Sequence, residues 1–193
     1  ENADALVMNL NGGSIDLCAH LTSAQASQLN QNFQVLEGTM NLVQAIYLNN
    51  QAKPFDNQLV RQALCYAIDR QGIMDMVADG HGTAVGSSIY PAFTKYFLPE
   101  LVDKYPHSVE KAKELLAEAG YPDGFSTTLW CSDAQVMRDS AVVIQEQLRQ
   151  VGINAEVKTL ESGQFQSETG NGAHDMFIMS KTSIDPDSML RSM

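Results

Sequence analysis

One stretch decides the fold: from Lys111 to Thr159 the chain reads KAKELLAEAGYPDGFSTTLWCSDAQVMRDSAVVIQEQLRQVGINAEVKT. Its first part carries apolar residues at the spacing of one helix face, and Ser108 just upstream is the predicted N-cap. Gly120 ends this helix because glycine accepts the left-handed cap, and the proline that follows shortly after cannot continue a helix. A second apolar stripe predicts a helix from about residue 138 to residue 150.

Predicted strands alternate with these helices. Residues 125–130 are rich in threonine and aromatic side chains, and residues 153–159 alternate apolar with polar ones, so both segments are typical of strands. A continuous apolar run at 176–179 predicts a strand covered on both faces. The order from Lys111 onward is helix, strand, helix, strand, short helix, strand, which favours crossover units on a mostly parallel sheet. The predicted fold class is therefore α/β.

Signals are weaker upstream. A helix from about Gln58 to Ala78 is predicted from its apolar stripe, with Asp56 or Asn57 as the cap. The stretches 80–103 and 182–188 are predicted to be irregular, and the second lies just past a strand, where ligand crevices form in open α/β sheets. Further predictions are strands at 14–19, 33–36 and 42–48 and weaker helices at 4–9 and 23–30.

Composition narrows the possible functions. With 193 residues, 44% of them hydrophobic and 18% charged, the chain is typical of a globular domain with a real core. Its 23 acidic residues outnumber 12 scattered basic ones, for a net charge of -11, which argues against binding to nucleic acid or to an anionic membrane surface. The sequence shows no apolar run near the roughly 20 residues that a membrane span requires.

Catalytic and metal-binding signatures are missing from the sequence. Four histidines and three cysteines form neither an HExxH pattern nor a cysteine knuckle. The glycine-rich stretch 80–86 has the wrong spacing for a phosphate loop and lacks its lysine, and no GxSxG elbow occurs. The sequence therefore predicts a protein that is not an enzyme and that holds neither a metal nor a cofactor.

Four blocks of the chain together resemble a known family, and they follow its order over nearly the whole chain. The blocks are NNQAKPFDN at 49–57 running into VRQAL and AIDR at 60–70, YP at 105–106 followed by EKAKELLAEAGYPDGF at 110–125, the IQ and QL positions and VGI of 144–153, and the segment from Asp175 to DPD at 185–187. They are similar to the corresponding blocks of the family 5 extracytoplasmic solute-binding proteins, the oligopeptide, dipeptide and nickel group that feeds ABC importers.

This resemblance implies one lobe of a class II periplasmic-binding-protein fold, with a mixed, mostly parallel sheet flanked by helices. Residues 1–193 would form a single domain, the second of two lobes, with the first lobe and the chain ends absent. The implied function is that of the substrate-binding component of an ABC-type importer, which captures a peptide or related small solute between its lobes and delivers it to a membrane permease. The protein would be extracytoplasmic and monomeric, and would meet the membrane only through a lipid anchor outside this sequence.

Two alternatives stay open: a nickel or metal-chelate binder of the same family, and a ligand-sensing lobe of a regulator. Because one lobe supplies only part of an enclosing surface, the isolated chain is expected to bind ligand weakly or not at all.

Ligand-binding residues follow from the resemblance in three segments: the polar loop after Trp130, the stretch from Ser180 to Asp185, and the end of the strand at 42–48. In peptide-binding members an aspartate three residues before the DP position typically holds the peptide's free amine. Thr182 stands there in this chain with Lys181 before it, which favours a ligand with a nearby acidic group. The candidate ligand-binding residues are Tyr47, Asn49, Trp130, Cys131, Asp133, Arg138, Ser180, Lys181, Thr182 and Asp185.

Three of these candidates have structural roles as alternatives. Arg138 either pairs with a ligand carboxylate or is an exposed residue of a first helical turn. Asp185 is a turn former as well as a candidate contact, and Trp130 either stacks on ligand or packs in the core.

Overall fold

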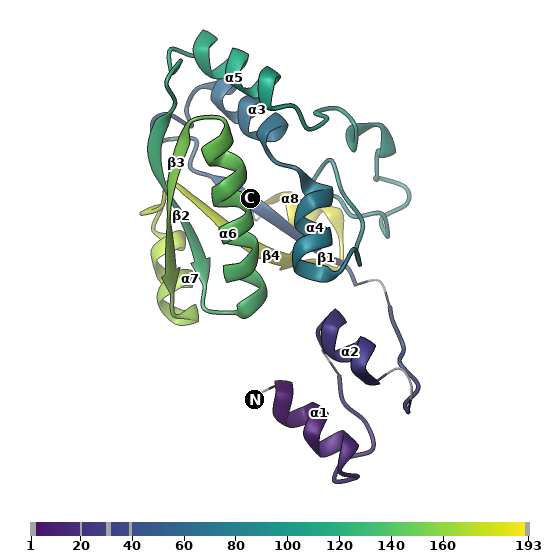
Figure 1. The fold of residues 1–193 in the computed structure, drawn as a ribbon. Helices are drawn as coiled ribbons and strands as arrows, with labels where there is room; N and C mark the ends of the chain where they lie inside the picture. The colour runs from purple at the N-terminus through teal and green to yellow at the C-terminus, as the bar shows by residue number, and fades with distance from the viewer. Residues whose placement is uncertain (1–2, 20, 30–31, 39, 192–193) are drawn as a thin grey trace.

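A four-stranded mixed sheet with helices on both faces forms the body of the molecule in the computed structural model, which describes residues 3–19, 21–29, 32–38 and 40–191 (Figure 1). The strand order is β1-β4-β2-β3. β1 (Leu42–Leu48) runs antiparallel to β4 (Met176–Thr182), whereas β2 (Phe125–Ser132) runs parallel to both β4 and β3 (Ile153–Leu160). The predicted α/β class with a mixed, mostly parallel sheet is confirmed.

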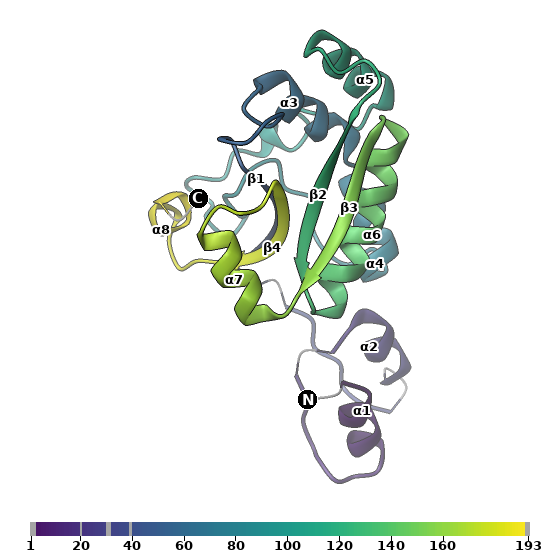
Figure 2. The same cartoon turned by 90° about the vertical axis from the view of Figure 1, so that its left-hand side faces the viewer.

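The helices are divided between the two faces of the sheet. One face packs against α3 (Gln58–Ala67), α4 (Arg70–Ala78), α5 (Val109–Glu118) and α6 (Gln135–Gln150), while α7 (Ser162–Gly170) and α8 (Pro186–Arg191) lie on the opposite side (Figure 2). The main core fills the space between the sheet and the first set of helices, where Leu129, Ile144, Leu148, Ile153 and Met176 are at most 1% exposed. This alternation of helices about the sheet follows from the crossover connections.

The helix predicted from Gln58 to Ala78 is two helices, α3 and α4. Ile68 is extended, with φ −89° and ψ 113°, and Asp69 then caps α4 by accepting a hydrogen bond from the backbone N–H of Gly72 at 3.0 Å. The side-chain amide of Gln147 bonds both the N–H and the carbonyl of Asp69, at 3.1 and 3.2 Å. The prediction of one continuous helix is wrong, because the Asp69 cap and the two hydrogen bonds with Gln147 stabilise the break between α3 and α4.

The N-terminal part forms two helices, as predicted, but lacks the predicted strands. α1 (Ala3–Asn11) and α2 (Ser23–Leu29) lie below the sheet in Figure 1 and contact each other, and the Ser23 hydroxyl donates to the Ala78 carbonyl at 3.1 Å. Residues 14–19 and 33–36 are irregular, so both strand predictions are wrong there. Neither segment has a neighbouring strand in the described part of the chain, and a strand needs one to pair its backbone groups.

The long connection over residues 80–103 is held against the body of the protein. It contains one short 3-10 helix, η1 (Pro99–Leu101). Arg70 donates to the carbonyls of Val102 and Tyr105 at 3.0 and 3.1 Å, and Tyr90 is 2% exposed and packs on Val43. At Gly86 a Cβ would stand 1.9 Å from a backbone carbonyl oxygen, so only glycine permits the close approach within this segment. In the described ranges no helix is both long and apolar enough to cross a membrane.

Candidate functional site

β2 and β4 separate where a ligand crevice is expected. The two strands pair only between Leu129 and Met176 and between Trp130 and Phe177, after which β4 continues beside β1 and curves away from β2 (Figure 2). The chain leaves β2 into α6 on one face and leaves β4 toward α8 on the other. Parallel strands whose connections lead to opposite faces form crevices beyond their carboxyl ends. The residues that follow β2 and β4 are therefore the candidate site.

The turn from β2 into α6 presents one acid and one base at this edge. Asp133 is exposed, and its carboxylate accepts a hydrogen bond from the Ser162 hydroxyl at 3.0 Å, which ties this turn to the start of α7. Arg138 is half-buried, and its guanidinium donates to the Asp133 carbonyl and to the side-chain oxygen of Gln135. Ala134, the N-cap of α6, has no side chain that caps the helix. A guanidinium beside a helix N-terminus favours an anionic group at this turn.

The second segment begins inside β4 and not after it. Ser180, Lys181 and Thr182 pair with Gln44, Val43 and Leu42 of β1, so the prediction that the strand ends at Met179 is wrong. Ser180 lies directly opposite Gln44, whose side-chain amide donates to the buried Ser140 hydroxyl of α6 at 2.8 Å. Thr182 is exposed and Lys181 is half-buried, and alternation along the strand places Lys181 on the opposite face from Ser180.

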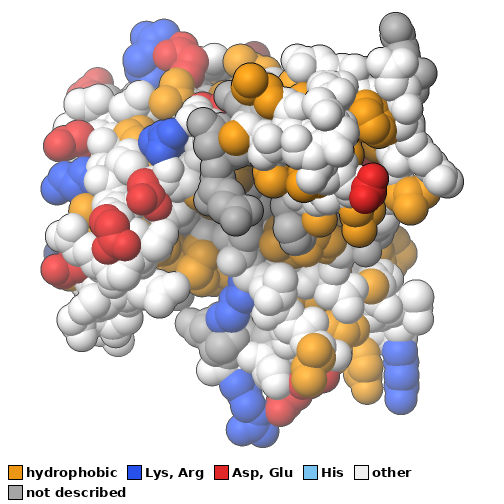
Figure 3. Space-filling view, turned by 90° about the horizontal axis from the view of Figure 1, so that it is seen from below, with side chains coloured by type: hydrophobic (Ala, Val, Ile, Leu, Met, Phe, Trp, Pro, Cys, Tyr) orange, Lys and Arg blue, Asp and Glu red, His pale blue; other side chains and the backbone are white. Residues whose placement is uncertain are grey.

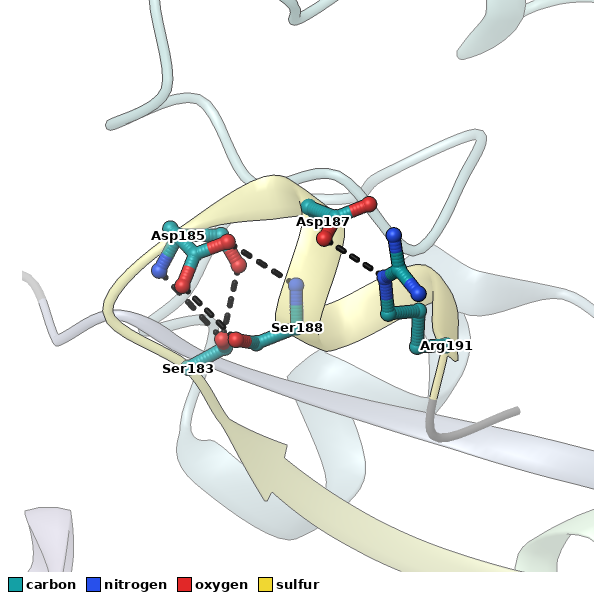
Figure 4. A network of polar contacts seen from close by, with 5 residues as sticks. All are labelled: Ser183, Asp185, Asp187, Ser188 and Arg191. Carbon is teal, nitrogen blue, oxygen red and sulfur yellow. Dashed lines mark hydrogen bonds and ion pairs between the residues drawn. The ribbon is translucent and has the colours of Figure 1, made fainter.

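Asp185 organises the turn that leads into α8. Its carboxylate accepts from the backbone N–H of Ser188 at 2.9 Å and from the Ser188 hydroxyl at 2.7 Å, while the Ser183 hydroxyl donates to the Asp185 carbonyl at 2.7 Å (Figure 4). The Ser188 N–H, followed by its hydroxyl, lowers the pKa of Asp185 below its ordinary value. At the other end of the helix Arg191 pairs with Asp187 at 2.6 Å. The turn-forming role that the sequence indicates for Asp185 is visible in these contacts.

Two candidates are held within the fold. Cys131 is fully buried in β2, because alternation turns it toward the core, and its Sγ lies 3.6 Å from the Thr159 hydroxyl. Its assignment to a polar loop is therefore wrong. Asn49 follows β1, and its side-chain amide donates to the carbonyls of Gly172 and His174 at 3.2 and 3.0 Å. The Asn49 side chain therefore joins the end of β1 to the segment that precedes β4.

Tyr47 and Trp130 both pair with Phe177, near the start of β4, and Trp130 is the last residue of β2 that still pairs with β4. Tyr47 stacks on Phe177, with ring centroids 4.9 Å apart, and Trp130 donates from its indole N–H to the Thr128 hydroxyl at 3.0 Å. Both belong to the face of the sheet opposite α6. The structure thus brings the turn after β2 and the end of β4 to one edge and places Tyr47 and Asn49 away from it, whereas Trp130 lies at the last position where β2 and β4 pair, at the base of the crevice.

Several polar residues that organise this region were missed at the level of sequence. Gln44, Ser140 and Ser162 link the strands and turns at the crevice, and the carboxylate of Asp175 accepts from the hydroxyls of Thr127 and Thr128 and from the Thr128 N–H, at 2.9–3.2 Å. Gln44 alone carried a usable signal, because it is a polar residue on the inward face of a predicted strand. Within the described ranges no group of three or more His, Cys, Asp or Glu side chains is arranged to hold a metal ion.

Figure 3 shows the molecule from below the view of Figure 1, with the side that carries the N-terminal helices toward the viewer. Apolar side chains gather on the right half of this view, where the N-terminal helices lie, and charged side chains of both signs are spread over the other half. Met8 and Leu17 of the N-terminal part are 74% and 86% exposed, and a shallow hollow lined by Leu6, Ile15 and Leu17 lies between α1 and the segment after it. This end of the molecule therefore presents both apolar and charged contact surface.

Sequence comparison relates the chain to transport proteins. A family model described as bacterial extracellular solute-binding proteins, family 5 middle, matches residues 1–193. The glutathione-binding protein GsiB of Escherichia coli (strain K12) is 37% identical over 142 residues, which make up 72% of this chain and 27% of that relative. The chain thus spans about a quarter of the length of such relatives.

Solved structures of similar fold include two peptide complexes. The dipeptide-binding protein of Pseudoalteromonas sp. SM9913, in complex with Met-Leu, superposes with a TM-score of 0.84 at 30% identity, over 97% of this chain and 38% of that one. The periplasmic binding protein DppA of Helicobacter pylori, in complex with the peptide STSA, gives a TM-score of 0.80 at 28% identity, over 100% of this chain and 38% of that one. The similarity in fold therefore extends over essentially the entire chain.

Proposed function

The chain belongs to family 5 of the bacterial extracellular solute-binding proteins, and from this premise we propose that the full-length protein is the substrate-binding component of an ABC-type importer. It captures a peptide or related small solute between two lobes and hands it to membrane permease subunits. Residues 1–193 contribute one wall of the binding cleft, as the second lobe. The observation that supports this proposal is the separation of β2 from β4, because the polar segments that follow the two strands then lie at the edge where open α/β sheets bind ligands.

The ligand is proposed to be a peptide-type solute that carries acidic groups. Arg138 and Lys181 bring positive charge to the two segments, and Thr182 has no charge with which to hold a free amine. Glutathione is the first compound to test, since the 37% identical relative is named for binding it, and a neutral dipeptide such as Met-Leu is the second. Charge-assisted hydrogen bonds to carboxylates are among the stronger polar contacts available to such a site.

Calorimetric titration of the full-length protein tests this proposal. We expect saturable binding of one acidic peptide per protein, and weaker or undetectable binding of Met-Leu and of nickel. Lys181→Gln should weaken the binding of the acidic peptide, whereas Lys113→Gln, an exposed lysine on α5, serves as the matched control and should leave it unchanged. Absence of binding to every peptide would contradict the transport role, and tight binding of nickel alone would favour the metal-chelate alternative.

The remaining features of the proposal follow the family. The protein works outside the cytoplasm as a monomer, binds without chemical change to its ligand, and reaches the membrane only through a lipid anchor outside these residues. Incubation of the full-length protein with the bound peptide should return the peptide intact by mass spectrometry. A cleaved or modified product would contradict the assignment as a binding protein.

A further inference from the structure

The long connection over residues 80–103 carries Tyr90 to the face of the sheet opposite α6. The two helices that flank the connection, α4 and α5, lie on the same face as α6 (Figure 2). Tyr90 instead packs on Val43, which alternates along β1 with Gln44, the residue bonded to Ser140 of α6. The connection therefore crosses to the opposite face and returns, and Tyr90 is anchored there with 2% of its surface exposed.

Apolar neighbours from the connection itself hold the Tyr90 ring. It stacks on the Phe93 ring with centroids 4.9 Å apart, and Val85 packs beside them. The backbone N–H of Phe93 donates to the Tyr90 carbonyl at 3.0 Å, which closes a turn between the two rings. Long loops packed by their own side chains are frequently functional. These contacts fix the ring of Tyr90 without using its hydroxyl.

The hydroxyl of Tyr90 reaches the chain that leaves β4. The backbone N–H of Ser183 donates a hydrogen bond to it. Burial raises the pKa of Tyr90 and this bond opposes the rise, so the hydroxyl is protonated at neutral pH. Ser183 is the first residue after β4, whose pairing with β1 ends at Thr182. The Tyr90 hydroxyl therefore supplies a partner to the backbone just where β1 stops supplying one.

This contact lies within the second polar segment of the candidate site. Val43, on which Tyr90 packs, lies directly opposite Lys181 and on the same face of the sheet. On the other side of the contact, the Ser183 hydroxyl accepts from the Asp185 N–H at 3.3 Å and donates to the Asp185 carbonyl at 2.7 Å (Figure 4). Tyr90 thus holds the chain between Lys181 and Asp185, the two charged residues of the stretch 180–185.

We propose that Tyr90 is a positioning residue of the ligand site, which holds the chain from Lys181 to Asp185 in the shape that binds an acidic peptide. This inference rests on the proposed function as a peptide-binding component of an importer. Tyr90 acts through the Ser183 backbone and not through contact with the ligand. Because the ring is fixed by its apolar neighbours, its hydroxyl can be removed while the packing is kept.

Amide hydrogen exchange of the ligand-free full-length protein, followed by NMR, tests whether Tyr90 holds this turn. Tyr90→Phe removes only the hydroxyl, so the amides of Asp185 and Ser188, which bond within the turn, should exchange about fivefold faster. This factor corresponds to the loss of one ordinary hydrogen bond. Tyr96→Phe makes the same change at a tyrosine of the same connection that is 54% exposed, and should leave both amides unchanged. Equal exchange rates in the two variants would overturn the proposal.

Calorimetric titration of the same variants with glutathione and with Met-Leu, far below the unfolding transition, tests whether the turn matters for binding. A purely structural role of Tyr90 would leave the affinity unchanged there, because the protein stays folded. We expect Tyr90→Phe to weaken the binding of glutathione about fivefold and Tyr96→Phe to leave it unchanged. Unchanged affinity in Tyr90→Phe, with faster exchange at the turn, would overturn the proposal and leave the transport role intact. If the unaltered protein binds neither peptide, the transport role fails, and the exchange rates alone decide whether Tyr90 holds the turn.

Discussion

Replacing Asn49 by alanine separates a role in the fold from a role in ligand binding. The side-chain amide of Asn49 donates to the carbonyls of Gly172 and His174 at 3.2 and 3.0 Å, and its oxygen accepts from the backbone N–H of Gln51 at 3.1 Å. The backbone N–H of Asn49 also bonds the Asp175 carbonyl at 2.9 Å. Asn49 thus ties the end of β1 to the segment that leads into β4.

The expected loss of stability follows from these contacts. Asn49→Ala removes three side-chain hydrogen bonds, two of them exposed and one half-buried, at about 0.5–1 kcal/mol each. The free energy of unfolding should therefore fall by about 2 kcal/mol. Asn50→Ala is the matched control, since Asn50 is exposed and its side chain has no hydrogen bond among the described residues. This control should cost less than about 0.5 kcal/mol.

Urea unfolding of the full-length protein, with ligand titration of the same variants below the unfolding transition, provides the assay. We expect Asn49→Ala to unfold at lower urea than Asn50→Ala and to bind the acidic peptide with unchanged affinity. A variant of normal stability with weakened affinity would contradict this structural role and would return Asn49 to the ligand site.

Three other predictions concern the body of the fold. Gly124→Ala should lower the free energy of unfolding in urea by about 3 kcal/mol or more, because φ is 78° there and the new Cβ would lie 1.9 Å from a carbonyl oxygen. Gly120→Ala has a similar φ of 91° but open space around the new Cβ, so it should lower this free energy by only about 1–2 kcal/mol. Equal losses in the two variants would contradict the clash at Gly124. Burial lowers the pKa of His174, so as the pH falls below 6.5 the unfolded chain takes up a proton before the folded protein does. The free energy of unfolding should therefore decline below pH 6.5, and it should decline less in His174→Gln. Identical pH profiles of stability for the two proteins would contradict this. Cys131 should react with N-ethylmaleimide only after unfolding whereas exposed Cys65 reacts in the folded protein, and labelling of folded Cys131, read by mass spectrometry, would place it outside the core.

Local signals were sufficient to locate the helices and strands between residues 109 and 160, although β2 ends two residues later and α6 begins three residues earlier than predicted. There the apolar spacing, the Ser108 cap and Gly120 all lie within a few residues of the elements that they define. The break at Asp69 was different, because the apolar stripe continues through it and the clamp comes from Gln147, 78 residues away. The segment at 14–19 has the composition of a strand but no neighbour to pair with among the described residues. Strand formation depends on such distant partners.

The candidate site was predictable only at the level of segments. Both polar stretches at the strand ends were identified, but the roles of single residues depend on distant contacts. Asn49 bonds carbonyls 123 and 125 residues away, and Cys131 is buried because β2 continues beyond Trp130. Had the predicted strand been extended from Trp130 to Ser132, its alternation of inward and outward side chains would have placed Cys131 in the core. No comparable signal in the sequence marks Asn49, since an asparagine after a strand is equally typical of a turn or of a ligand contact.

Calorimetric titration of the full-length protein with glutathione, beside Met-Leu and nickel, is the direct test of its proposed role as a peptide-binding component of an importer. We expect saturable binding of one acidic peptide per protein, with the affinity reduced by Lys181→Gln and unchanged by Lys113→Gln. Binding of nickel without any peptide, or no binding of any peptide-type solute, would contradict it.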